Sequence, residues 1–270
     1  MAEKLGYTPD PFLSAMANYR RKHGEARYHG VIGWINHWAQ PESLHQFGEF
    51  EEYWAGAKET AKPFGYSLEE IRWPAECPAK KFERLLLARG ILGVLIPPHR
   101  QSLDWGNFDW SKFSLIRFGM SVHQPDSNMV TSDQARAVVM AVTKMHAYGY
   151  KRIGMIVERE LDRALGGNYF SGFAWAQELL ATAGGIPPFS PNREQYRAQP
   201  EAGLERLHRW LKEQQPEAIL TSEPQIPDQL RQLGYRIPRD IAVVGTSVRD
   251  IPVDAGIDQR SRVSRLCPTG

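Results

Sequence analysis

Short apolar runs alternate with amphipathic segments along most of the chain, from Gly30 onward. A short apolar run bounded by polar or turn residues predicts a buried strand, and apolar residues spaced three and four apart predict a helix. Strands that alternate with helices are typical of a parallel α/β architecture. The strands expected from this pattern lie at 31–35, 93–96, 114–118, 152–157, 218–220 and 240–245.

The same order of elements occurs twice. The strand at 31–35 and the following helix at 50–57 are matched by a strand at 152–157 and a helix at 169–176. A long helix from Ser132 to Tyr148 joins the halves. Two such βαβ lobes predict a clamshell, because ligands of open parallel sheets bind beyond the carboxyl ends of the strands.

Composition adds limits to this picture. The chain has 270 residues, 42% of them hydrophobic, which is enough for two cores. A net charge of +2 gives no global attraction to nucleic acid, although Arg20, Arg21 and Lys22 form a short basic run that is typical of a solvated surface. Cys77 and Cys267 lie far apart, so neither a disulfide framework nor a zinc site is expected.

Signals for export and for catalysis are missing. The charged N-terminus has no apolar stretch of a secretory signal, and no run is long enough to span a membrane, which predicts a cytoplasmic protein without a membrane partner. The nucleophile elbow, the P-loop and the His-Glu-x-x-His motif are absent, and the histidines lack ligand spacing. We therefore expect no enzyme, no catalytic residue, no bound metal and no cofactor.

The first sixteen residues read as two short helices with a turn between them. Gly6 followed by Pro9 is a helix-stop signal, and Asp10 with Pro11 can begin the next helix. An ordinary frayed N-terminal helix is the alternative interpretation.

These features together resemble the lactose-repressor (LacI/GalR) family. The start of the chain is similar to the end of that family's DNA-binding headpiece, and the segment 147–154 is similar to its helix–Gly–basic–strand element. The segment 233–245, LGYRIPRDIAVVG, is the most specific match. The resemblance extends from residue 1 to about residue 259 and implies two Rossmann-like lobes of the periplasmic-binding-protein-like type I fold, preceded by a remnant hinge helix of a helix-turn-helix headpiece.

The resemblance also implies how the chain is divided. Residues 1–27 would be the headpiece remnant and hinge helix, 28–122 the N-terminal lobe, 123–255 the C-terminal lobe and 256–270 a crossover with an irregular tail. A family member would carry a complete helix-turn-helix before the hinge and a long amphipathic helix after Gln259, so this chain is expected to be truncated at both ends. In the hinge, Met16 takes the position of the residue that enters the DNA minor groove, and the implied DNA contacts are Pro9, Leu13, Ala15 and Met16.

Candidate ligand contacts follow the predicted strands. Indole faces can stack on sugar rings, which makes Trp38 and Trp54 candidates, although Trp54 and Trp175 lie on apolar helix faces that favour the core. Asp133 matches the family's crossover acid and can equally be a helix-terminal acid. The ligand-binding residues we predict are Trp38, His99, Asp133, Arg163, Tyr169, Glu223, Ser247 and Asp250.

Several polar positions depart from the family. Tyr169 stands where the family has its effector-contacting Arg, Ser222–Glu223 replaces an Asn-Asp pair, and Ser247 replaces an Asp. The resemblance implies a homodimeric transcriptional regulator that binds operator DNA in its full-length form and senses a small polar effector, a carbohydrate, between its lobes. The alternatives are a stand-alone cytoplasmic sugar-binding or sensor protein and a non-functional repressor fragment.

Overall fold

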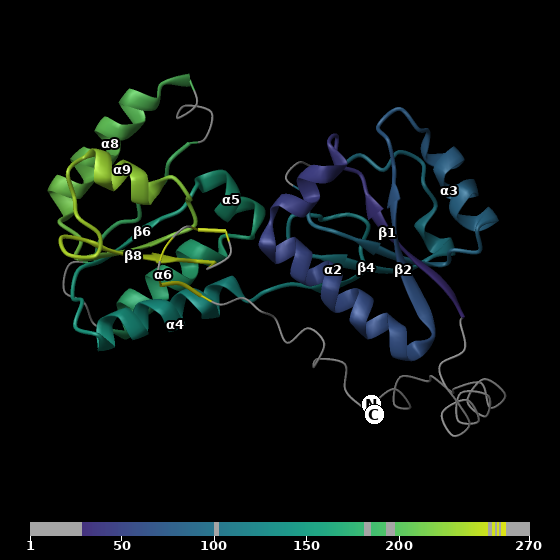
Figure 1. Cartoon of the computed structure of the whole chain (residues 1–270), viewed down its shortest axis with the longest axis horizontal. Helices are drawn as coiled ribbons and strands as arrows, with labels where there is room; N and C mark the ends of the chain where they lie inside the picture. The colour runs from purple at the N-terminus through teal and green to yellow at the C-terminus, as the bar shows by residue number, and fades with distance from the viewer. Residues whose placement is uncertain are drawn as a thin grey trace.

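The structure, a computed structural model, describes residues 29–99, 103–180, 185–192, 198–247, 250–251, 253 and 255–257. They form two α/β lobes, each built on its own parallel sheet (Figure 1). The predicted fold class is therefore confirmed for the two lobes. The expected hinge contacts Pro9, Leu13, Ala15 and Met16, and the expected tail from 258 onward, lie outside the described residues.

The N-terminal sheet has five parallel strands in the order β2-β1-β3-β4-β5. Their bounds are β1 (Gly30–Asn36), β2 (Tyr66–Arg72), β3 (Gly93–Ile96), β4 (Ser114–Phe118) and β5 (Asn128–Val130). The apolar runs predicted as strands supply the three inner strands. The polar edge strand β2 buries only Leu68 and Ile71, which is why its sequence gives a weaker strand signal.

Helices cover both faces of this sheet. On one face, α2 (Gly48–Ala61) packs Tyr53 against Trp34 and Phe118. On the other face, α3 (Ala79–Ala88) packs with an aromatic-rich loop. The described part of the lobe also contains the 3₁₀ helices η2 (Pro41–Gln46), η3 (Lys62–Phe64) and η4 (Trp110–Lys112).

The C-terminal sheet has three buried strands, β6 (Ile153–Ile156), β7 (Ala218–Thr221) and β8 (Ala242–Gly245). The register pairs Ile153 with Ala218 and Ala218 with Ala242. Single parallel bridges extend it at both edges, Ile156 to Phe189 and Gly245 to Gly256. Strands buried on both faces explain the continuous apolar runs in this half of the sequence.

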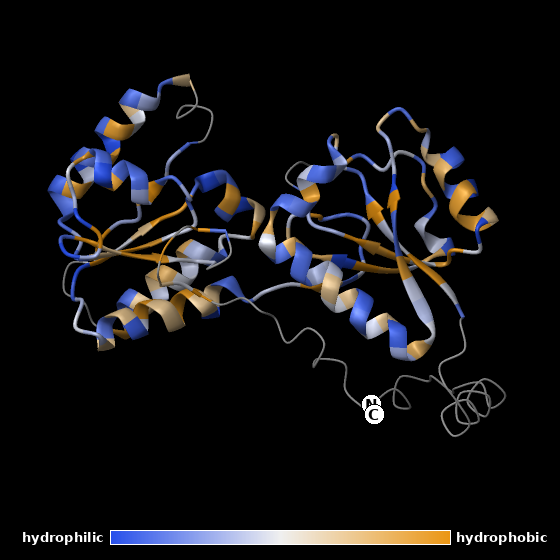
Figure 2. Cartoon of the chain, viewed as in Figure 1, coloured by the Kyte–Doolittle hydropathy of each residue, from blue (hydrophilic) through white to orange (hydrophobic). Residues whose placement is uncertain are grey.

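The helices described around the C-terminal sheet are α4 (Gln134–Ala147), α5 (Arg159–Ala164), α6 (Asn168–Leu179), α8 (Pro200–Gln214) and α9 (Ile226–Gln232). The pair α4 and α6 shares one core with one face of the sheet, and α8 and α9 share a second core with the other face. Figure 2 shows apolar strands in the middle of each lobe, surrounded by helices in which apolar and polar residues alternate.

Two details differ from the sequence-based expectations. The lobes were expected to divide between residues 122 and 123, but β5 pairs with β4, which keeps residues 128–130 in the N-terminal sheet. Trp175 was expected in the core and is 58% exposed, because α6 turns Gly172, Phe173 and Ala176 inward instead. Trp54 packs at the edge of its lobe's core, in an edge-to-face contact with Trp34.

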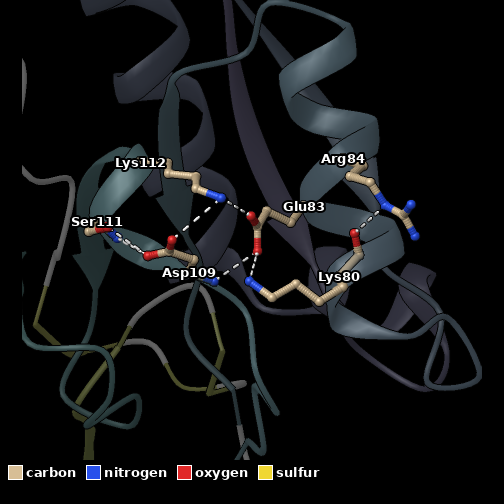
Figure 3. Close-up of polar contacts among 6 residues, drawn as sticks. All are labelled: Lys80, Glu83, Arg84, Asp109, Ser111 and Lys112. Atoms are coloured by element: carbon tan, nitrogen blue, oxygen red, sulfur yellow. Dashed lines mark hydrogen bonds and ion pairs between the residues drawn. The ribbon is translucent and has the colours of Figure 1, made fainter.

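A buried carboxylate connects α3 to the aromatic-rich segment 105–113 by ion pairs and a hydrogen bond (Figure 3). Glu83, whose side chain is 3% exposed, forms ion pairs with Lys80 and Lys112 and accepts a hydrogen bond from the Asp109 backbone N at 3.1 Å. The hydrogen bonds from both lysines hold the pKa of Glu83 at about 2, below its ordinary 4.5. The loop fastened here carries Trp105 and Trp110.

We expect Glu83→Gln to lower Tm by several degrees at pH 7, because the amide loses both ion pairs. A carboxylate with a depressed pKa stabilises the fold above pH 4.5, and this contribution is lost as pH falls towards about 2. The difference in Tm between wild type and variant should therefore narrow across that range in thermal melts.

Glu69→Gln is the matched control, since Glu69 pairs with Arg89 at an exposed position and should change Tm little. A gap between wild type and Glu83→Gln that does not depend on pH would contradict the proposed role of the charge.

Candidate functional site

The carboxyl ends of the two sheets carry the residues that join the lobes. The Gly48 backbone N, after the β1 loop, donates a 2.8 Å hydrogen bond to Oδ1 of Asp250, which follows β8. The Asn168 amide, at the start of α6, donates at 3.0 Å to the thioether of Met120, which follows β4. In Figure 1 helix α2 begins on the side of its lobe that faces the C-terminal lobe. These contacts lie beyond the ends of the strands, where the sequence predicts the ligand site.

A partly buried carboxylate links α2 to the connection between the lobes. Oε1 of Glu49 accepts hydrogen bonds from the Tyr53 hydroxyl at 2.8 Å and the Ser132 hydroxyl at 2.9 Å. Burial raises the pKa of Glu49, and the charge of Asp250 raises it further. The Gln134 amide extends the chain of contacts by donating to Ser132 Oγ at 2.8 Å. Glu49 therefore connects α2 to the segment that joins the two lobes.

The C-terminal lobe contributes a polar group around the start of α6. Asp162 Oδ1 accepts from the backbone N of Tyr169 at 2.9 Å and of Phe170 at 3.2 Å, which fixes this helix end. Tyr169 is 7% exposed, and burial, followed by the Glu49 charge, raises the pKa of its hydroxyl. A hydrogen bond joins that side chain to Thr246, which follows β8.

Two further predicted residues lie on the same edge of the C-terminal sheet. The Ser247 hydroxyl donates to Asp250 Oδ2 at 2.8 Å. Buried Glu223 accepts from the Glu158 backbone N at 3.1 Å and from the Ser222 hydroxyl at 2.9 Å. Because Glu223 spans the ends of β6 and β7, it orders this edge of the sheet.

In the N-terminal lobe, Trp38 and His99 lie together. Their ring centroids are 5.7 Å apart, and the Trp38 indole N–H donates to the Pro98 carbonyl at 3.0 Å. Phe47 and Phe50 also contact the Trp38 ring, so the indole is already partly enclosed by aromatic rings. Burial lowers the pKa of His99 to about 4.

Two predicted residues stand apart from these groups. Asp133 is exposed and caps α4, with Oδ1 accepting from the Arg136 backbone N at 2.9 Å. This contact is that of the helix-terminal acid, the second interpretation drawn from the sequence. Arg163 is exposed on α5. The structure thus brings together Tyr169, Ser247 and Asp250 on one side of the inter-lobe region and Trp38 with His99 on the other.

The sequence-based prediction missed Glu49, Tyr53 and Ser132. Glu49 and Tyr53 are spaced one helical turn apart on α2, and their partner Ser132 is distant in the sequence. Only the position of Glu49 in the sequence could have marked it as a candidate, since it lies in the first turn of the helix that follows the first strand. Among the described residues no group of three or more metal-binding side chains occurs, and no described helix is long and apolar enough to cross a membrane.

Comparisons with known proteins agree with this geometry. Residues 142–255 match the family model of the periplasmic binding protein-like domain. A regulatory protein of the LacI family from Chloroflexus aggregans superposes with a TM-score of 0.61 at 18% identity, over 88% of this chain and 87% of that one. A search of curated proteins finds no significant match.

Two further solved structures share the fold of this chain. The transcriptional regulator CelR in complex with cellobiose has a TM-score of 0.62 at 14% identity, over 95% of this chain and 83% of that one. The lac repressor dimer bound to operator and the anti-inducer ONPF has a TM-score of 0.57 at 17% identity, over 96% and 88%. The chain shares their fold.

Proposed function

Because the chain has the two-lobed fold of the LacI-family regulators, with a periplasmic binding protein-like domain over residues 142–255, we propose that it is a transcriptional regulator of this family without enzymatic activity. A small polar effector, a carbohydrate, binds between the lobes. The observation that carries the proposal is the hydrogen bond from Gly48 to Asp250, which joins the carboxyl ends of two sheets at the place where ligands of parallel sheets bind.

The proposed mechanism is closure of the lobes around the effector. A ligand that contacts Asp250 and Tyr169 on one lobe and Trp38 on the other binds the closed arrangement more tightly, and so shifts the population towards it. In a cytoplasmic homodimer, closure would change the spacing of the hinge segments, whose DNA contacts we propose to be Pro9, Leu13, Ala15 and Met16. Effector and operator affinity would thereby be coupled.

A carbohydrate is the effector class best supported by the side chains. Carboxylates such as Asp250 accept hydrogen bonds from hydroxyls, and the apolar face of a pyranose packs on aromatic rings such as Trp38. CelR, which shares the fold, is a regulator solved with cellobiose.

The test is a thermal-shift and calorimetric screen of the full chain against glucose, galactose, ribose and cellobiose. At a concentration one hundred times Kd, a sugar that binds only the folded state should add about 2.7 kcal/mol of stability. Asp250→Ala, which removes the acceptor for Gly48, should weaken binding of the same sugar about tenfold. Asp228→Ala is the control, because Asp228 is exposed on α9 and paired with Arg231.

DNA binding is tested separately, by selecting bound duplexes from a random pool with the full chain and repeating the selection with the best sugar. A change in DNA affinity on adding the sugar supports coupling. Sugar binding without any selected duplex would overturn the DNA-binding part of the proposal, and no response to any sugar would overturn the carbohydrate effector.

A further inference from the structure

Two histidines follow neighbouring strands of the N-terminal sheet. His37 comes directly after β1 and His99 shortly after β3, and these strands pair in parallel. The Nδ1 atom of His37 lies 2.6 Å from the Trp73 carbonyl oxygen, and that of His99 lies 2.9 Å from the Pro97 carbonyl oxygen. Because a carbonyl oxygen only accepts, Nδ1 carries a proton in both rings, and in a neutral His99 ring Nε2 is left as an acceptor.

The Nε2 atom of His99 is buried and has no hydrogen-bond partner among the described residues. His99 is only 4% exposed, and burial lowers its pKa to about 4, so the ring is neutral at pH 7. A buried acceptor without a donor destabilises the fold, and a ligand donor would remove that penalty. The atom is therefore suited to receive an O–H or N–H group.

The indole ring of Trp105 lies beside both histidines and forms an apolar surface next to them. The Trp105 ring centroid lies 5.6 Å from that of His37 and 6.4 Å from that of His99. The Ser121 hydroxyl accepts from the His99 backbone N at 3.1 Å, and Ser121 follows Met120, which touches the C-terminal lobe. The histidine pair thus lies next to the inter-lobe contact.

A metal ion fits this pair poorly. A third metal-binding side chain does not join the two rings in the described part of the chain, and the wall around His99 is formed by indoles. A cation placed there would lose its hydration without a carboxylate to replace it. An uncharged donor avoids that cost.

The polar groups at the contact between the lobes are also acceptors. Glu49 and Asp250 present carboxylates, and Oε1 of Gln134, which is 4% exposed, is buried without a partner among the described residues. In the described residues, no lysine or arginine side chain forms an ion pair with Glu49 or Asp250. An anionic ligand would meet repulsion here, whereas a ligand rich in hydroxyls would satisfy these oxygens.

We propose that His99 and His37 form a hydroxyl-recognising subsite that selects neutral sugars with adjacent free hydroxyls over phosphorylated or carboxylated ones. This inference rests on the proposed carbohydrate effector. It adds that the effector is uncharged and that His99 recognises one of its hydroxyl groups.

The test uses the full chain and the neutral sugar that stabilises it most, with glucose, glucose 6-phosphate and glucuronate as a fixed comparison set. His99→Phe keeps an aromatic ring and removes the acceptor, so Kd should rise at least about tenfold. His99→Gln restores a side-chain oxygen and should recover binding to within about threefold of wild type. His123→Phe changes an exposed histidine and is the control. Melts without sugar show whether each variant folds.

A neutral sugar that binds wild type and His99→Phe equally would overturn the subsite while leaving the effector proposal intact. The subsite would also be overturned if glucose 6-phosphate or glucuronate bound as tightly as glucose. If no sugar of either charge class binds, the proposed function fails and the subsite with it. Loss of binding in His99→Phe with recovery in His99→Gln supports the inference.

Discussion

Gly172→Ala is expected to destabilise the C-terminal lobe by about 3 kcal/mol, since overpacking a tight contact costs this much. Gly172 lies where α6 crosses α4, and a Cβ there would be 2.6 Å from the Ala135 carbonyl oxygen and 2.8 Å from Ala135 Cα. Both are backbone atoms, so the helices themselves would have to separate. For a chain of this size the loss corresponds to a fall in Tm of about 8 °C, measurable by circular dichroism.

The same substitution should also reduce the response to sugar. The start of α6 carries Tyr169, and α4 begins next to Ser132, so separating the helices moves one group of the candidate site away from the other. Ser171→Ala is the matched control, because Ser171 is exposed on the neighbouring position of α6 and its change should stay within about 0.5 kcal/mol. Equal stability of Gly172→Ala and wild type would show that the two helices are farther apart than described.

Arg117→Met should cost about 2–3 kcal/mol, because it leaves buried carbonyl oxygens without donors. Arg117 is 9% exposed, and its guanidinium donates to the Val122 carbonyl, to the Ser127 hydroxyl at 3.0 Å and to the Ser127 carbonyl at 3.3 Å. These contacts hold the segment between β4 and β5, which carries Met120 and Ser121. We therefore expect weaker sugar binding as well as a lower midpoint in urea denaturation.

Arg152→Met provides a close comparison. Arg152 also donates to two carbonyl oxygens, those of Gln214 and Gln215, but at an exposed position where water can replace it. Its substitution should change stability by no more than about 0.5 kcal/mol. Similar losses in the two variants would mean that burial of Arg117 adds nothing to the strength of its contacts.

Local pattern was sufficient for the elements with continuous apolar runs. The strands at 93–96, 114–118 and 218–220 coincide with β3, β4 and β7 within a residue, and the helix predicted from Ser132 to Tyr148 contains α4. Strand β2 and the short β5 were not predicted, because edge strands bury few side chains and their sequences lack a clear apolar run. Trp175 shows the converse, since its hydropathy does not reveal which side of α6 faces the core.

For the candidate site, the sequence indicated the strand ends but not the pairs formed there. Ser247 and Asp250 are three residues apart and could be predicted together, whereas the contact of Asp250 with Gly48 joins segments from opposite ends of the chain. Asp133 illustrates a residue whose two interpretations differ only in where its side chain points, and the structure gives it a helix cap.

The parallel α/β class, the repeated lobe and the resemblance to the LacI/GalR family follow from the order of residues alone, because hydrophobic periodicity and short motifs are local properties of a chain. The meeting of Glu49, Ser132 and Tyr53 depends on how distant segments pack, and so do the hydrogen bonds of buried Arg117 to carbonyl oxygens. The same packing leaves Nε2 of His99 without a partner among the described residues. Burial and hydrogen-bond satisfaction depend on residues far apart in the sequence, and they exist only once the sheets and helices have packed.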